Sequence, residues 1–208
     1  MERRKRFFIS TRLLFAGGVL LILSSLIQLC WRIPAFLTLF PLDVLLFSVS
    51  IPYAIGLIIT VVGLAFVCNI NKSFLKAFIF CCIVATFNFI NFLPLSAQAL
   101  LVISGFPLAS LIINVLVIFT YHYAIDGISW YFDVLGDKER SRLGQKIMWL
   151  YVLFIGLGCA MSWLPRFIPS IEEFLPVATA LSVLEDVFFL TGYTIYVVYV
   201  GRSMNKDF

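Results

Sequence analysis

The first apolar stretch of the chain, residues 13–31, reads LLFAGGVLLILSSLIQLCW and decides the fold. It contains no charged residue, and a helix of about 20 such residues crosses the hydrocarbon layer of a bilayer. The basic segment 2–12 precedes it, as in a secretory signal peptide. Because no small-residue cleavage site follows, we expect an uncleaved first transmembrane helix.

Five further apolar stretches have the same character, and the composition agrees with them. Hydrophobic residues make up 62% of the 208 residues and charged residues only 12%, about half the charged share of a soluble domain. In lipid only helices and closed barrels satisfy every backbone polar group, and these stretches are too uniformly apolar for barrel strands. We therefore predict an all-α polytopic membrane protein with one domain over residues 1–208. Its predicted transmembrane helices are 13–31, 52–70, 75–93, 106–125, 147–164 and 176–200.

The basic residues predict the orientation. All lysines and arginines except Arg32 and Arg166 fall into four clusters. The clusters are 2–12, 72–76, 138–146 and 202–206. Cytoplasmic loops are enriched in lysine and arginine, and six crossings place all four clusters on one side. We expect cytoplasmic N- and C-termini and a location in the bacterial cytoplasmic membrane. Separated clusters do not form the concentrated basic face that nucleic acids require, so no nucleic-acid partner is expected.

Three connections between the predicted helices are unusual. Segments 33–51 and 94–105 are apolar and carry or adjoin prolines, so each is interpreted as a partial helix on or in the membrane surface. Alternatively, the second helix begins near Pro41 and kinks at Pro52. The cytoplasmic connection 126–146 is the most polar stretch, and is either a solvated loop or a docking surface for a partner subunit.

Two adjacent acids, Glu185 and Asp186, lie within the last predicted helix. Glu185 is about 15 Å from the outer edge of the hydrocarbon at 1.5 Å per residue, and an acid at that depth costs about 2.5–3.5 kcal/mol. No lysine or arginine lies in a predicted helix core to compensate. Arg32 and Arg166, at outer helix ends, would have to reach inward. Otherwise the acids are protonated, or they meet water, a cationic ligand or a partner's basic residue.

Other polar residues share faces with these acids or with each other. Ser182 and Tyr193 belong with Glu185 to one stripe of the last helix, in which successive members are three or four residues apart. The remaining candidates for lining a ligand or ion site are Asn88, Asn91 and Asn114. The alternative is that the serines and asparagines only join helices, through hydrogen bonds of about 0.6 kcal/mol each. Small residues at 56, 60 and 63, and at 156 and 160, predict close helix packing.

The sequence carries no motif for a catalytic, metal or cofactor site. The single histidine, His122, cannot form a typical zinc site, and neither H-E-x-x-H, a nucleophile elbow nor a P-loop occurs. No metal and no cofactor are expected. Enzymatic activity is the least supported of the functions considered.

Two hypotheses remain for the function. In size, helix number, cytoplasmic termini and elaborate first outer connection, the chain resembles the substrate-binding component of energy-coupling-factor vitamin transporters. The nearest match to the small-residue docking motif of that family is Ala16, Gly17 and Gly18. The resemblance implies a membrane subunit that binds or transports a small solute, including a cationic one, from the outer side. The second hypothesis is a non-catalytic accessory or scaffold subunit of a larger membrane complex.

Overall fold

The computed structural model describes residues 2–32, 42–90, 107–168 and 175–204. Over these ranges the chain forms six helices and no strand, which confirms the predicted all-α class. The helices are α1 (Glu2–Trp31), α3 (Leu42–Val67), α4 (Lys72–Ile90), α6 (Pro107–Val134), α7 (Lys138–Phe167) and α9 (Leu175–Met204).

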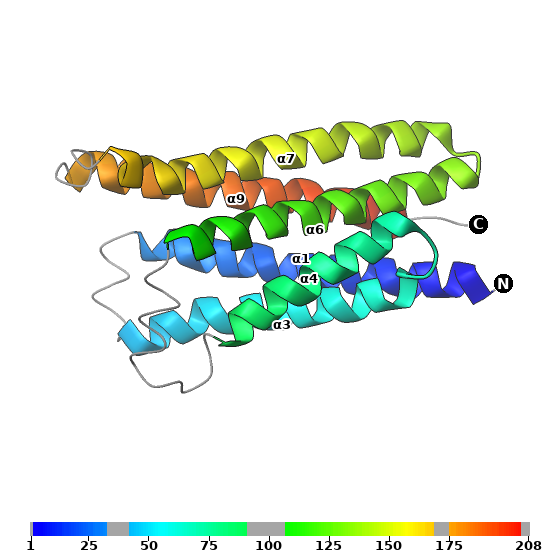
Figure 1. Cartoon of the computed structure of the whole chain (residues 1–208), viewed down its shortest axis with the longest axis horizontal. Helices are drawn as coiled ribbons and strands as arrows, with labels where there is room; N and C mark the ends of the chain where they lie inside the picture. The colour runs from blue at the N-terminus through cyan, green and yellow to red at the C-terminus, as the bar shows by residue number, and fades with distance from the viewer. Residues whose placement is uncertain (1, 33–41, 91–106, 169–174, 205–208) are drawn as a thin grey trace.

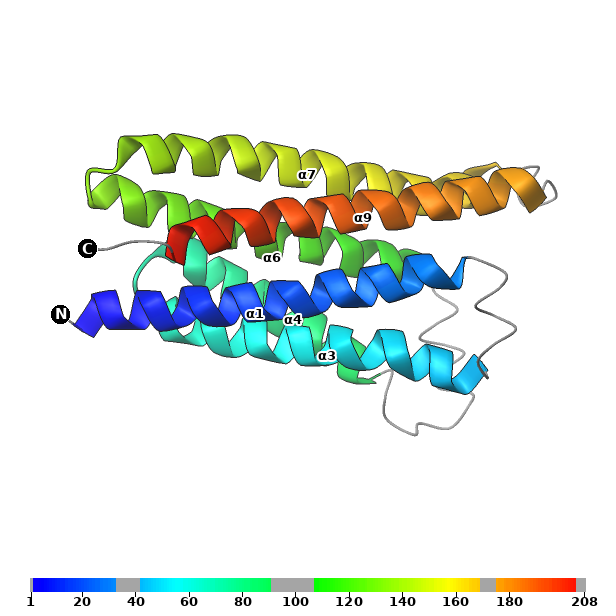
Figure 2. The same cartoon turned by 180° about the vertical axis from the view of Figure 1, so that it is seen from behind.

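The six helices form a closed ring in chain order (Figures 1 and 2). Each helix packs on the next one along the chain, and α9 returns to pack on α1. The start of α1, the end of α9 and the α3–α4 and α6–α7 turns lie at the same end of the bundle. We call it the basic end, because the described basic residues other than Arg32 and Arg166 lie toward it.

The outer surface of the ring is apolar and suited to contact with a lipid bilayer. Large exposed side chains include Leu23, Ile58, Ile79, Leu153 and Val187. By length and composition, five helical segments can cross a membrane, which indicates a membrane-integral protein. The segments are Glu2–Trp31, Ser48–Val67, Leu111–Val134, Lys138–Leu164 and Pro176–Met204. The shorter α4 is not among them in the described part of the chain, so a sixth crossing stays a prediction.

A cluster of buried tyrosines fills the middle of the ring. The ring of Tyr121 meets those of Tyr151, Tyr193 and Tyr196 edge-on, with centroids 5.9, 5.9 and 4.7 Å apart. All four side chains are at most 5% exposed. Edge-to-face pairs of this kind contribute about 0.5–1.5 kcal/mol beyond the area they bury, so the cluster fixes α6, α7 and α9 around one centre.

Small residues bring α1 and α3 into backbone contact. A Cβ added to Gly17 would lie 2.8 Å from the carbonyl oxygen of Gly56, and one added to Gly56 would lie 3.0 Å from that of Gly17. The predicted close packing at 56, 60 and 63 is therefore confirmed. The same prediction for residue 156 is wrong, because a Cβ on Gly156 would meet nothing within 4 Å.

The predicted loop 126–146 is also wrong. α6 continues to Val134 and α7 begins at Lys138, so only a short turn separates them. Gly136 adopts φ +81°, a conformation that glycine accepts without strain. Asp137 then caps α7 by accepting a hydrogen bond from the backbone of Arg140. The polar residues of this stretch thus lie at the ends of two helices and in the turn between them.

The second predicted helix follows the alternative that begins near Pro41. α3 starts at Leu42 and runs through Pro52, which lies inside it. The interpretation of 33–51 as a separate surface segment is wrong for residues 42–51, which belong to α3. Its remaining part, 33–41, and the predicted segment 94–105 lie outside the described residues.

Candidate functional site

The two acids of α9 line a pocket of about 200 Å³ inside the ring, which we call the acidic pocket. It lies between α1, α3, α6 and α9, in the half of the bundle away from the basic end. Its lining residues are Ser24, Ser25, Gln28, Tyr53, Asn114, Val117, Glu185, Asp186, Phe189 and Tyr193. The inward faces of four helices thus bring carboxylate, amide and hydroxyl groups to one space.

Asp186 is the most buried charged group of the pocket. Its side chain is 3% exposed, and its Oδ2 accepts a hydrogen bond at 3.0 Å from Nε of Arg32. Arg32 follows the last residue of α1, and the packing of α1 on α9 brings the two together. The sequence placed Arg32 at an outer helix end, and the structure shows that its side chain reaches Asp186. The ion pair offsets the cost of burying the carboxylate, which otherwise has to be protonated.

Glu185 also lines the acidic pocket, although it is adjacent to Asp186. Adjacent residues on a helix point about 100° apart, and both directions open into this pocket. The flanking Leu184 and Val187 are exposed on the outer surface of the ring. Both acids therefore face the interior of the ring rather than its outer surface.

α1 supplies polar groups that the sequence analysis did not single out. Ser24, Ser25 and Gln28 line the pocket, and Ser24 donates a hydrogen bond at 2.9 Å to the carbonyl oxygen of Val49 in α3. The i, i+4 spacing of Ser24 and Gln28 places them on one helix face, and this was the signal in the sequence that could have identified them. Tyr53 of α3 completes this side of the pocket.

α6 and α9 form the opposite side, with Asn114 and Val117 one turn apart on α6. On α9, the rings of Phe189 and Tyr193 stack with centroids 6.4 Å apart. Tyr193 belongs to the central tyrosine cluster, so the acidic pocket ends against that cluster. Of the residues proposed from sequence, the structure thus brings together Glu185, Asp186, Asn114 and Tyr193.

The other proposed site residues do not line the acidic pocket in the described structure. Ser182 is partly buried on α9 but is not part of the lining. Asn88 donates a hydrogen bond at 2.8 Å to the carbonyl oxygen of Val84 within its own helix, which satisfies it locally. Asn91 and the side chain of Arg166 lie outside the described residues.

The chemistry of the lining favours a ligand that donates hydrogen bonds. Ionised carboxylates only accept hydrogen bonds, and the amide, serine and tyrosine groups can accept or donate. The described lining residues include two acids and no lysine or arginine. A volume of about 200 Å³ is below the roughly 300–1,000 Å³ of pockets for drug-sized ligands, so the space suits a small solute. Comparison of the chain with protein-family models, with curated proteins and with solved structures finds no match.

Proposed function

We propose that this protein is a membrane subunit that binds a small, hydrogen-bond-donating or cationic solute in the acidic pocket. The observation that carries the proposal is the convergence of Glu185 and Asp186 of α9 with Asn114 of α6 on one internal space. Acids within a membrane are costly and mark ligand or ion pathways more often than they serve helix packing.

The topology proposed with this function has six crossings and both termini in the cytoplasm. α4 has 19 residues, and at 1.5 Å per residue it is about 28 Å long, close to the thickness of the hydrocarbon layer. The basic end of the bundle would then face the cytoplasm by the positive-inside rule. The acidic pocket lies in the other half, so the solute enters from the outer side of a bacterial cytoplasmic membrane.

The pocket does not by itself supply energy for transport. The sequence contains no P-loop, so a transporter built on this chain would take its energy from an ion gradient or from another subunit. An accessory role is the competing hypothesis. The ion pair between Asp186 and Arg32 weakens it, because the cation that compensates Asp186 comes from the same chain.

Native mass spectrometry of the protein released gently from its own membrane tests the proposal. We expect a bound small molecule in the wild-type protein and its loss in Glu185→Gln, which keeps the shape of the side chain. Asp133→Asn, an exposed acid on α6 outside the pocket, is the matched control and should retain the molecule. A co-purifying protein without any small molecule would favour the accessory role, and a small molecule retained in Glu185→Gln would contradict the assignment of this pocket.

A further inference from the structure

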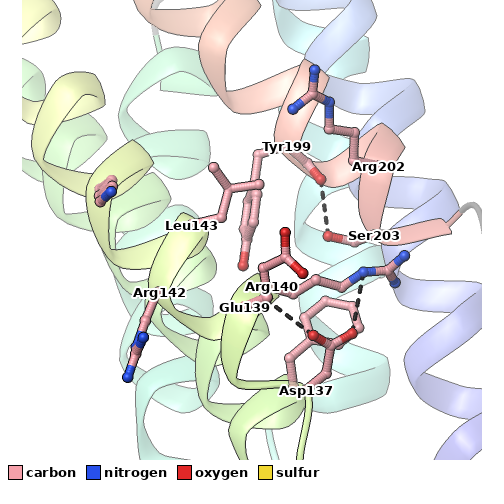
Figure 3. A pocket seen from close by; sticks show the side chains of 10 residues that line it. Asp137, Glu139, Arg140, Arg142, Leu143, Tyr199, Arg202 and Ser203 are labelled. Atoms are coloured by element: carbon pink, nitrogen blue, oxygen red, sulfur yellow. Dashed lines mark hydrogen bonds and ion pairs between the residues drawn. The ribbon is translucent and has the colours of Figure 1, made fainter.

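A second and larger cavity opens at the basic end, and its lining on α9 begins at Tyr199, six residues after Tyr193 of the acidic pocket. It measures about 930 Å³ and lies between the ends of α6, α7 and α9 (Figure 3). We call it the basic cleft. Its polar lining includes Asp137, Glu139, Arg140, Arg142, Lys146, Tyr199 and Arg202. The solute-binding role proposed above makes no use of it.

The charge of the basic cleft is positive. Four of its lining side chains are basic and two are acidic. Arg140 is paired with Asp137 at 3.3 Å, and Asp137 is further engaged as the cap of α7. Arg142, Lys146 and Arg202 are exposed and form no ion pair with any described residue. Arg142 belongs to α7 and Arg202 to α9 (Figure 3), so two helices contribute unpaired basic side chains to the lining.

Two buried hydrogen-bond donors belong to the lining of the same cleft and have no acceptor among the described residues. They are the hydroxyl of Tyr199 and Nη1 of Arg140. Tyr199 is only 2% exposed, and its hydroxyl lies against α7, where a Cβ on Gly144 would come within 2.2 Å of it. A buried donor without an acceptor costs about 1–3 kcal/mol, so this arrangement suits a ligand that brings acceptor oxygens.

We propose that the basic cleft binds the phosphate group of an anionic ligand. The phosphodiester of a lipid headgroup offers only acceptors at neutral pH, and inorganic phosphate offers mainly acceptors; either pairs with guanidinium groups through two hydrogen bonds at once. That chemistry matches two unsatisfied donors beside exposed arginines. The group comes either from the headgroup of an anionic phospholipid, since basic pockets at helix ends bind such headgroups, or from a soluble phosphate compound.

The test uses the full-length protein in nanodiscs of phosphatidylcholine. Calorimetric titration with inorganic phosphate measures the binding of a soluble phosphate. Binding of a lipid headgroup is measured as the shift in unfolding temperature when phosphatidylglycerol replaces part of the phosphatidylcholine. We expect at least one response in the wild-type protein. Arg142→Gln combined with Arg202→Gln should reduce the apparent affinity or the shift at least about tenfold, because each removes a charge-assisted hydrogen bond.

Two single substitutions separate binding from structural effects. Tyr199→Phe removes only a buried hydroxyl that has no described partner, so it should leave stability without ligand unchanged or slightly raised, and weaken the response about fivefold. Lys72→Gln removes an exposed charge at the same end of the bundle that is not part of the lining, and should respond as the wild type does. Absence of any response to both probes, or equal responses in all variants, would overturn the proposal. The acidic pocket is untouched by these changes, so its assignment stands or fails separately.

Discussion

Replacing Gly17 by alanine tests the close contact between α1 and α3. The new Cβ would lie 2.5 Å from Oγ1 of Thr60 and 2.8 Å from the carbonyl oxygen of Gly56. That carbonyl is backbone and cannot rotate away, and Thr60 is held by its own hydrogen bond to it at 2.8 Å. Since carbon and oxygen atoms approach to about 3.3 Å, the helices have to separate by about 0.5 Å. Overpacking of this kind costs about 1–3 kcal/mol.

Gly156→Ala supplies the matched control for this experiment. Both glycines lie inside helices, and alanine is favoured over glycine there by about 1 kcal/mol. The Cβ at position 156 meets nothing within 4 Å, so Gly156→Ala should be stabilised by the full difference in helix propensity between alanine and glycine. We therefore expect Gly17→Ala to be about 1–3 kcal/mol less stable than Gly156→Ala, and up to about 2 kcal/mol less stable than the wild type.

The free energy of unfolding can be measured by titrating the protein in mixed micelles with a denaturing detergent. Each 1.4 kcal/mol changes the ratio of folded to unfolded protein tenfold, so the expected difference is well resolved. Equal stability of the two alanine variants would refute the reasoning, because it would mean that α1 and α3 separate at no cost.

Four further substitutions are expected to act as follows in the same titration. Arg32→Ala should lower the free energy of unfolding by about 2 kcal/mol, because it leaves Asp186 buried without its cation, and the 36% exposure of Arg32 reduces the loss below that of a fully buried pair. Asp186→Asn should lower the free energy of unfolding by less than Arg32→Ala does, because Arg32 can turn toward solvent when its partner is removed. Ser129→Ala should cost about 1 kcal/mol, since it removes the 2.7 Å hydrogen bond to the carbonyl oxygen of Ser141 that joins α6 to α7. Tyr196→Phe should leave stability unchanged or raise it by up to about 1 kcal/mol, because its buried hydroxyl has no described partner.

Each of these expectations has an opposite result that contradicts it. A loss in Asp186→Asn larger than in Arg32→Ala would mean that Arg32 cannot turn toward solvent when its partner is removed. An unchanged free energy of unfolding in Ser129→Ala would show that water replaces the serine hydroxyl as donor to the carbonyl oxygen of Ser141. A clear loss of stability in Tyr196→Phe would mean that its hydroxyl is hydrogen-bonded in the membrane.

The helical class and the position of the acidic site could be predicted because both depend on the cost of placing polar groups in lipid. An uninterrupted apolar stretch such as 13–31 has no stable alternative to a helix. Glu185 and Asp186 stand out in the last helix for the same reason, and acids in this setting face the bundle interior. Asn114 and Tyr193 share that interior, so their inward-facing stripes meet in the structure.

The residues that complete the acidic pocket could not be found in the same way. Serine and glutamine cost far less than a carboxylate in a membrane, so Ser24, Ser25 and Gln28 did not stand out. The packing of α1 on α9 closes the ring of helices. Hydropathy along the sequence does not reveal that contact, because the two helices are far apart in the chain. Hydropathy likewise cannot separate a loop from a helix that continues into water, which is why 126–146 was predicted as a loop.

Closure of the ring between the first and the last helix sets the order in which the protein can be assembled during synthesis. Arg32 and Asp186 are 154 positions apart in the chain, and at roughly 5–20 residues per second the ribosome needs about 8–30 s to travel from one to the other. During that interval α1 is already made while its partner α9 does not yet exist. A chain stopped before α9 therefore contains neither acid of the pocket, and its ring of helices stays open.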